Sequence, residues 1–120
     1  MREPIIGKAS IASTTGTVLV GQGPDGVSCS GNSFEGEFLN VVNNNLSRTG
    51  YVEVSGNSFP IGDLRVVSNK NGTALGNQDI EVEANIIAGK LWCTANSPAP
   101  TNDGYPNQAA ARFGQCTGAF

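Results

Sequence analysis

The stretch Val52-Glu-Val-Ser-Gly-Asn57, followed by Leu64-Arg-Val-Val-Ser-Asn69, decides the fold class of this 120-residue chain. Each half alternates apolar with polar residues and ends on an asparagine. Both halves recur, as Ile80-Glu-Val-Glu-Ala-Asn85 and Leu91-Trp-Cys-Thr-Ala-Asn96. Alternation with period two is typical of a β-strand with one face pointing inward. A long repeat period is typical of a solenoid, a propeller or an array.

A looser copy precedes these two. Val27-Ser-Cys-Ser-Gly-Asn32 matches the first strand and places Cys29 at the apolar position equivalent to Val54. Phe38–Asn44 matches the second strand, but keeping its apolar residues in step with the later copies needs one extra residue. We therefore expect a local bulge near Phe38.

Two short strands per unit, a Gly-Asn corner between them and a variable closing loop describe one coil of a parallel β-helix. Successive coils of such a helix stack about 4.8 Å apart. Ala9–Ala12 and Gly16–Val20 resemble the first and second strands of a degenerate coil. We expect residues 1–26 to form that coil, 27–96 the regular coils and 97–120 a C-terminal loop and cap. The residues expected in the core are Val52, Val54, Leu64, Val66, Ile80, Val82 and Leu91.

Asparagine suits the corners of such a coil for two reasons. Its backbone tolerates the left-handed conformation of a sharp turn, and its amide can bond to the backbone and to the asparagine of the next coil. We expect a ladder of stacked amides, with a glycan or ligand role as the alternative. The ladder residues are Asn32, Asn57, Asn85, Asn69 and Asn96.

Composition and charge argue against several function classes. The net charge is −3 and the seven Lys and Arg residues are scattered, so the clustered positive charge of nucleic-acid-binding proteins is missing. The chain contains no His, which excludes His-based metal sites and Ser-His triads. No run of about 18 apolar residues is present to cross a membrane. We expect no nucleic-acid partner, no membrane insertion, no cofactor and no metal site.

Three cysteines leave at least one unpaired within a monomer. Cys93 and Cys116 flank the last coil-like stretch and are the better candidates for a pair. Cys29 is interpreted as a small buried hydrophobic residue.

The end of the chain resembles a group of known proteins. The segment Gly89–Asn107, followed by Gly114-Gln-Cys116, is similar to the ending of secreted, largely uncharacterised β-helix proteins of actinobacteria. The asparagine-cornered units resemble the right-handed parallel β-helix superfamily, which includes pectate-lyase-like enzymes. The resemblance implies a Cys93–Cys116 disulfide and an extracellular or cell-surface protein, and it implies no activity. We therefore expect an all-β, right-handed parallel β-helix, a solenoid of about four coils of roughly 25–28 residues.

Trp92 and Tyr105 are candidates for ligand binding. Trp92 alternates with the inward positions Leu91 and Cys93, so its indole should point outward, where it could stack on a sugar ring beside Tyr105. The alternative is that the loop 97–107 covers the indole with its prolines.

Glu53 and Glu81 are the second pair of candidates. They are equivalent positions of successive units, so their carboxyl groups should lie one coil apart on the outer face. Two carboxyl groups that close can bind a cation or share a proton; the alternative is a solvated outer face.

The chain shows no recurring Asp, Arg and Lys cluster of the kind that polysaccharide lyases and hydrolases need. We therefore expect a non-catalytic extracellular or cell-surface structural or binding module. Its candidate partner is a polysaccharide or cell-wall glycan. The alternative is a minimal polysaccharide-active, pectate-lyase-like enzyme.

The N-terminal end offers an edge for self-association. A β-helix ends in strands that have no partner coil, and such edges invite pairing with another chain. We expect this end either to self-associate or to be a cut from a longer solenoid. Its charged residues and proline oppose pairing, whereas its isoleucines favour it: Arg2, Glu3, Pro4 and Lys8 against Ile5, Ile6 and Ile11.

Overall fold

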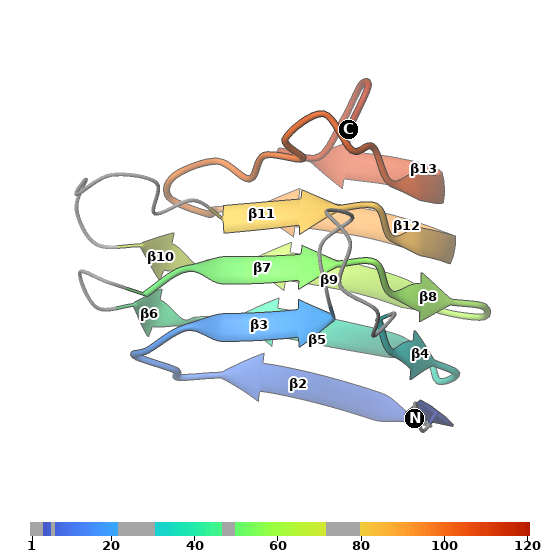
Figure 1. Ribbon diagram of the computed structural model, residues 1–120, viewed down its shortest axis with the longest axis horizontal. Coiled ribbons are helices and arrows are strands. Elements are labelled where there is room, and N and C mark those ends of the chain that lie inside the picture. Colours follow the sequence, from blue (N-terminus) through green and yellow to red (C-terminus); the bar gives the residue numbers. More distant parts are fainter. Residues whose placement is uncertain (1–3, 6, 22–30, 47–49, 72–79) are drawn as a thin grey trace.

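The computed structural model describes residues 4–5, 7–21, 31–46, 50–71 and 80–120. All the regular secondary structure in these residues is β-strand, and the paired strands all run parallel (Figure 1). The expected all-β class is confirmed for this part of the chain. The strands are β1 (Pro4–Ile5), β2 (Lys8–Ala12), β3 (Val18–Gly21), β4 (Ser33–Phe34), β5 (Phe38–Val42), β6 (Asn45–Leu46), β7 (Val52–Ser55), β8 (Ser58–Phe59), β9 (Asp63–Val67), β10 (Lys70–Asn71), β11 (Ile80–Glu83), β12 (Ile86–Thr94) and β13 (Gln108–Gly114).

The strands form three parallel sheets around one apolar core. The large sheet has the order β1-β4-β8-β12-β9-β5-β2, with β13 added to β12. The long β12 joins its two parts, because its start pairs with β8 and its end with β9. The other sheets are β11-β7-β3 and β10-β6. We call each pass of the chain around the core a layer: β1–β3, β4–β7, β8–β11, β12 and β13. In Figure 1 the layers are stacked from β2 at the bottom to β13 at the top.

Three pairs of equivalent strands of the second and third layers lie 25 residues apart along the chain, and the fourth, β7 with β11, lies 28 apart. Leu39 pairs with Leu64, and Ser33 pairs with Ser58, at this same spacing. In-register stacking places apolar residues on apolar residues, so one continuous core runs through the layers. All seven residues that we expected in the core are confirmed there, since each is 0% exposed.

The expected bulge near Phe38 is wrong, because the pairing of β5 with β9 runs without a shift. Glu37, rather than Gly36, lies opposite Gly62. The Asp63 N–H donates to the Glu37 carbonyl at 3.0 Å, and a Cβ added to Gly62 would collide with that same oxygen. Matching the two glycines shifts the alignment by one residue, and this false match produces the apparent bulge.

The first layer differs from our expectation in its strand order. β2 pairs with β5 and β3 pairs with β7, so Ala9–Ala12 takes the second-strand place and Val18–Val20 takes the first-strand place. Val20 is the register partner of Val54 and fills the position expected for Cys29, which lies outside the described residues. The two types of strand alternate along the chain, so a coil can be counted from either one. Two short alternating segments therefore fit the repeat in either order.

At most of the corners the left-handed residue is the one before the ladder asparagine, not the asparagine itself as we expected. Ser68, Ala84 and Ala95 have φ values of 56°, 52° and 56°. This left-handed residue turns the chain so that the next side chain points inward, and Asn69 and Asn85 are 0% exposed. A left-handed conformation costs a non-glycine residue about 1–2 kcal/mol, which the hydrogen bonds of the buried amide offset.

Two ladders of amide side chains run through the layers, and all five expected asparagines belong to them. In the first ladder, Asn57 donates from its backbone N and its Nδ2 to Asn85 Oδ1, at 3.0 and 3.1 Å. Its Nδ2 also donates to the Val20 carbonyl. This pattern continues from layer to layer. The first ladder is Asn32, Asn57, Asn85 and Asn107, and the second is Asn44, Asn69, Asn96 and Gln115.

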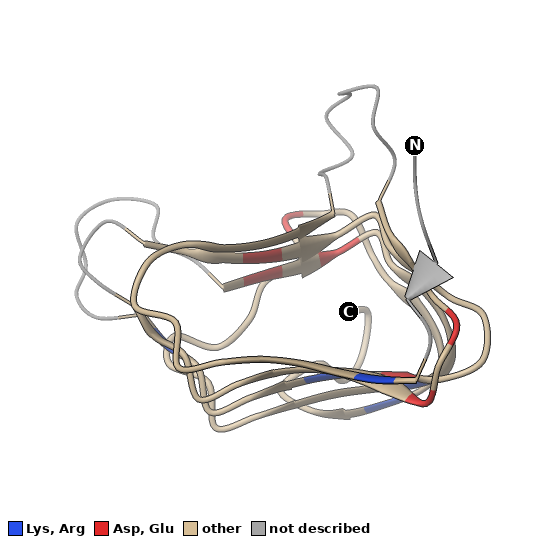
Figure 2. Cartoon of the chain, turned by 90° about the horizontal axis from the view of Figure 1, so that it is seen from below, with Lys and Arg blue, Asp and Glu red and all other residues tan. Residues whose placement is uncertain are grey.

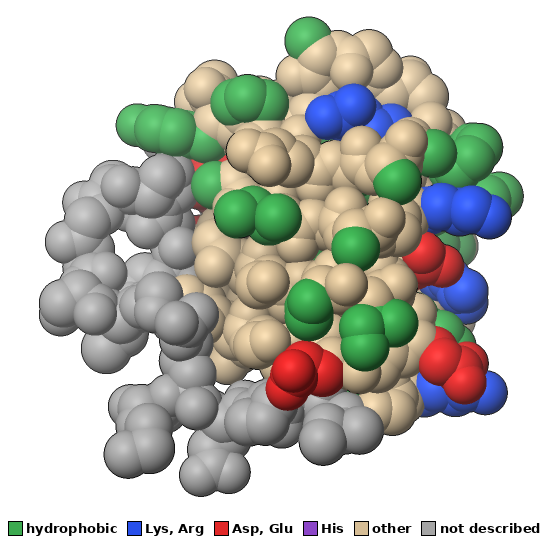
Figure 3. All heavy atoms as spheres, turned by 90° about the vertical axis from the view of Figure 1, so that its right-hand side faces the viewer, with side chains coloured by type: hydrophobic (Ala, Val, Ile, Leu, Met, Phe, Trp, Pro, Cys, Tyr) green, Lys and Arg blue, Asp and Glu red, His purple; other side chains and the backbone are tan. Residues whose placement is uncertain are grey.

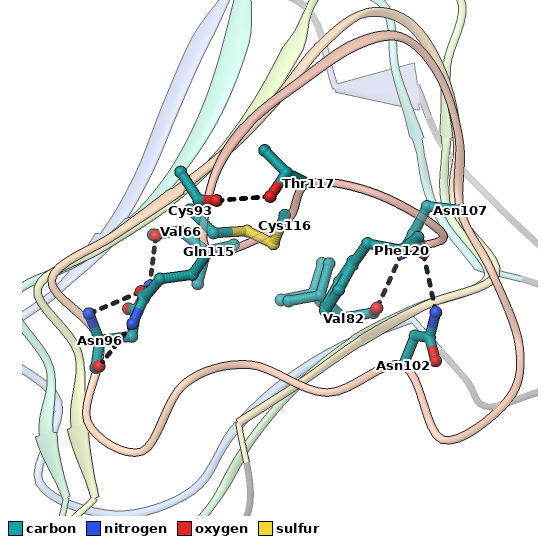
Figure 4. Close-up of a disulfide and its surroundings, with 12 residues drawn as sticks. Val66, Val82, Cys93, Asn96, Asn102, Asn107, Gln115, Cys116, Thr117 and Phe120 are labelled. Carbon is teal, nitrogen blue, oxygen red and sulfur yellow. Dashed lines mark hydrogen bonds between the residues drawn. A yellow bond between two sulfur atoms is a disulfide. The ribbon is translucent and has the colours of Figure 1, made fainter.

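Both ladders end at the C-terminal segment (Figure 4). Gln115 Oε1 accepts from the backbone N and Nδ2 of Asn96, at 2.9 and 3.0 Å. The Phe120 main-chain oxygen accepts from the backbone N and Nδ2 of Asn107, at 2.9 and 3.0 Å. Each oxygen takes the place of the next asparagine oxygen, so the buried donors of the last rungs are satisfied.

Cys93 and Cys116 form a buried disulfide beside these ladder ends, with Cα atoms 5.3 Å apart (Figure 4). The pairing implied by the resemblance is confirmed. The bond ties the segment after β13 to the end of β12, and Phe120 packs against the core from the same side. The upper end of the core is therefore closed.

Candidate ligand-binding surface

The outward face of the large sheet carries a strip of aromatic and basic side chains. Arg65 on β9, Trp92 on β12 and Phe113 on β13 are register partners in neighbouring strands. Phe38 on β5 lies against this row, and Lys90 precedes Trp92 by two residues and so shares its face. Because paired strands lie about 4.8 Å apart, aligned side chains form a continuous surface across them. We call these five residues the aromatic–cationic strip.

Contacts between rings and charges hold the strip in place. The Arg65 guanidinium carbon lies 4.4 Å from the centroid of the Phe38 ring. The rings of Trp92 and Phe113 have centroids 5.0 Å apart and planes tilted by 31°. Lys90 Nζ lies 5.9 Å from the Phe113 ring centroid. Contacts of these kinds contribute roughly 0.5–1.5 kcal/mol each, so the side chains are partly ordered before any ligand arrives.

A groove of about 290 Å³ opens beside the indole, lined by Asp63, Arg65, Val67, Lys90 and Trp92. Asp63 Oδ1 accepts the Lys90 backbone N–H at 2.8 Å, and Asp63 Oδ2 lies 3.6 Å from an Arg65 guanidinium nitrogen. The Asp63 carboxylate therefore positions the Arg65 guanidinium and ties β9 to β12. The Trp92 side chain is 41% exposed, which leaves part of the ring free for a ligand.

Of the two main sheets, the large one carries the basic residues, whereas acidic residues lie on both. Figure 2 shows Lys and Arg along the large sheet and the glutamates of β7 and β11 on the opposite sheet. In Figure 3 basic side chains are stacked above one another along one edge of the molecule, with acidic side chains between them. The groove thus carries both cations and hydrogen-bond acceptors beside an apolar ring, a combination suited to a polar ligand with apolar faces.

Our expectation that Trp92 points outward agrees with this geometry. The indole packs against Phe113 and stays partly exposed. The 97–107 loop instead bonds to β10 and β11 through the Ser97 and Thr101 carbonyls, so the alternative in which it covers the indole is wrong. Tyr105 is 47% exposed but lies at the corner between β11 and β12, where its carbonyl accepts the Ala84 N–H at 3.0 Å. Trp92 lies near the far end of β12. The structure therefore does not bring Trp92 and Tyr105 together in one site.

Glu53 and Glu81 are register partners on β7 and β11, as expected for equivalent positions. Carboxylate oxygens of Glu53, Glu81 and Glu83 lie within 4.8 Å of one another. Burial first, and then the nearby carboxylates of Asp103, Glu53 and Glu83, raise the pKa of Glu81 from 4.5 to about 7. This acidic cluster can share a proton, and its oxygens are of the type that hard cations prefer.

The acidic cluster lies on the sheet opposite the strip. A glycosidase needs two carboxyl groups on either side of one sugar bond. A sugar held in the groove beside Trp92 therefore does not meet Glu53 or Glu81. The four candidates from the sequence fall on three surfaces: Trp92 on the large sheet, Tyr105 at a corner, and the two glutamates together on the second sheet.

The sequence contained a partial signal for the rest of the strip. Arg65 is the repeat equivalent of Trp92, since both lie between two inward residues. Phe113 could not be found in this way, because the pairing of β12 with β13 shifts register between Ile87 and Lys90. That shift removes the regular spacing on which repeat matching depends.

Comparison of the chain with protein-family models, with curated proteins and with solved structures gave no match. Among the described residues, no helix is long and apolar enough to cross a membrane.

Proposed function

We propose that the chain is a right-handed parallel β-helix that acts as a non-catalytic polysaccharide-binding module outside the cell or at its surface. The in-register parallel layers support the β-helix, because each layer adds one strand to the edge of the preceding one. Right-handedness follows from the strong preference of parallel crossover connections for that hand. The Asn spacing of 25–28 residues from Asn32 to Asn85 in the first ladder and from Asn44 to Asn96 in the second supports a solenoid.

The aromatic–cationic strip carries the proposal of polysaccharide binding. The apolar face of a sugar ring can stack on Trp92, while the Arg65 and Lys90 donors reach its oxygen atoms. The strip crosses several strands, so it suits an extended chain of sugars more than a small compact ligand. Its side chains are mounted on a hydrogen-bonded sheet, so little order has to be gained on binding.

The disulfide supports the extracellular location. Disulfides such as Cys93–Cys116 persist mainly in oxidising compartments and are rare in the reducing cytosol.

A glycan and cell-wall polysaccharide array tests the function, with wild type compared with Trp92→Ala. We expect wild type to bind at least one polysaccharide and Trp92→Ala to lose about 5- to 30-fold in affinity, equivalent to about 1–2 kcal/mol for a stacked ring. Tyr105→Ala is the matched control, because Tyr105 is a similarly exposed aromatic residue outside the strip. Binding that is lost in Tyr105→Ala and retained in Trp92→Ala would contradict the assigned surface.

The raised pKa of Glu81 supports the second candidate, a minimal polysaccharide-active enzyme. A carboxyl group that titrates near neutral pH beside a second carboxylate is a common acid–base arrangement. Release of reducing or unsaturated sugar by wild type, lost in Glu81→Gln, would favour the enzyme over the binding module.

A further inference from the structure

Core positions remain partly open at the end of the stack that the first layer forms. Ala9 and Ile11 on β2 are the register partners of Leu39 and Val41 on β5. Leu39 and Val41 are 1% and 0% exposed, whereas Ala9 and Ile11 are only half-buried. At these positions one more strand is needed to complete the burial seen one layer higher.

The strands of this layer also have unpaired backbone edges on the side away from the second layer. Among the described residues, β2 pairs with β5 alone and β3 pairs with β7 alone. One edge of each strand therefore has no described strand to accept its N–H groups or donate to its carbonyls. At the opposite end β13 likewise pairs with β12 alone, but there Gln115 and Phe120 complete the two ladders and the disulfide ties the segment after β13 to β12. An unpaired edge strand is a template for another strand.

We propose that this end binds a second copy of the chain, with β2 pairing antiparallel to β2 of the copy about a two-fold axis through Ser10. The β2 sequence is self-complementary in this register. Because inward residues must face inward residues, Ala9 pairs with Ile11 of the copy, a small side chain beside a larger one. Lys8 pairs with Ala12 of the copy, so the two lysines do not oppose each other. This register, in which Ser10 faces Ser10 of the copy, pairs all five residues of β2.

The layer-to-layer contact inside the molecule is the model for this interface. Each layer already accepts another through parallel strands and stacked apolar side chains, and the copy continues that contact with antiparallel hydrogen bonds. A two-fold contact of this kind closes as a dimer and does not grow into a filament. The dimer is independent of the proposed ligand.

One consequence of the dimer rests on the proposed function. In this register the outward-facing residues of both copies lie on the same face of the paired strands. The two large sheets therefore become continuous, and both aromatic–cationic strips lie on the same side. Two strips on one face can bind one polymer chain at two places, which raises the apparent affinity without a new contact.

Cysteine crosslinking tests the interface directly, in a Cys29→Ser background that keeps the Cys93–Cys116 bond. Opposed residues of antiparallel strands have Cα atoms about 4.5–5.5 Å apart, within disulfide reach. Ser10→Cys should therefore form a covalent dimer under mild oxidation. Ala12→Cys is the matched control, since its two copies lie roughly 13 Å apart along the strand, beyond that reach. Equal crosslinking of the two variants, or none with Ser10→Cys, overturns the proposal.

Light scattering at rising protein concentration gives the second measurement, because Ile11→Glu places a charge in the new interface. We expect wild type to approach twice the monomer mass and Ile11→Glu to remain a monomer. The circular dichroism of Ile11→Glu shows whether it is folded. Wild type that stays monomeric, or a folded Ile11→Glu that dimerises as well as wild type, overturns the proposal even if Ser10→Cys can be trapped at high concentration.

Discussion

Replacing Asn69 with alanine removes one of the two inner rungs of the second ladder. The Asn69 side chain accepts from the backbone N and Nδ2 of Asn44, at 3.3 and 2.8 Å. It donates to the Val41 carbonyl at 2.8 Å and to Asn96 Oδ1 at 2.9 Å. Alanine keeps the backbone N–H of residue 69 but loses all four of these side-chain hydrogen bonds.

The expected loss follows from the burial of these groups. A hydrogen bond contributes about 1 kcal/mol net, and a buried donor left without an acceptor costs about 1–3 kcal/mol. The Asn44 Nδ2 keeps the Ile11 carbonyl at 3.1 Å, so the Asn44 backbone N–H is the donor most affected. Four lost bonds therefore lower the free energy of unfolding by about 4 kcal/mol, a large share of the roughly 5–15 kcal/mol that stabilises a typical domain.

Equilibrium unfolding in urea measures this loss. The control is Asn45→Ala, because Asn45 is exposed and lies one residue from Asn44; such surface changes stay within about 0.5 kcal/mol. The slope of the transition should not change, since the fold is kept. A loss below about 1 kcal/mol for Asn69→Ala, or equal losses for both variants, would refute the view that the ladders hold the layers together.

Three further predictions concern stability. Replacing left-handed Ala84 with glycine should leave the melting temperature unchanged or raise it by a few degrees, because the left-handed φ costs alanine more than glycine; a fall of several degrees would show that the corner is not strained. The pKa of Glu81 is about 7 in the folded chain and ordinarily 4.5, so folding favours the protonated form: its stabilising effect is complete below about pH 4.5 and is lost as the pH rises through 7. Because the carboxyl is partly exposed, the full pKa shift is not converted into stability, and we expect unfolding titrations to show about 1–2 kcal/mol less stability at pH 8 than at pH 5. Glu81→Gln should abolish this difference. An equally steep loss of stability with pH in Glu81→Gln would assign the difference to another group. Replacing Cys116 with serine opens a loop of 23 residues and should cost about 3 kcal/mol, and a variant with unchanged thermal stability would show that the disulfide is not needed to close the upper end.

The sequence predicts the regular part of this fold well, because its alternation and its asparagines record direct physical needs. Val52 and Leu64 had to be buried, and Asn57 and Asn85 had to satisfy buried backbone groups. Where the repeat decays, the same reasoning fails. Val18–Val20 occupies the first-strand place that we expected the segment with Cys29 to take, since either alternating segment fits the pattern.

The candidate site was harder to predict than the fold. Alternation gives the direction of a side chain, so Trp92 was correctly placed outside. It does not give the neighbours across strands, which depend on register. Tyr105 was expected beside Trp92 because the two are close in sequence, but the intervening loop carries it to the corner next to Ala84. Phe113 is the real neighbour, brought there by the irregular pairing of β13.

The fluorescence of the single tryptophan tests the proposed polysaccharide-binding surface most directly. Trp92 is the only tryptophan of the chain, so its emission reports on the groove without any label. A soluble form of the polysaccharide selected by the array is titrated into wild type and Tyr105→Ala. We expect a saturable shift in emission in both, with the affinity found on the array. Binding to the polysaccharide without any change in Trp92 emission, or no binding to any polysaccharide, would contradict the assigned function of the aromatic–cationic strip.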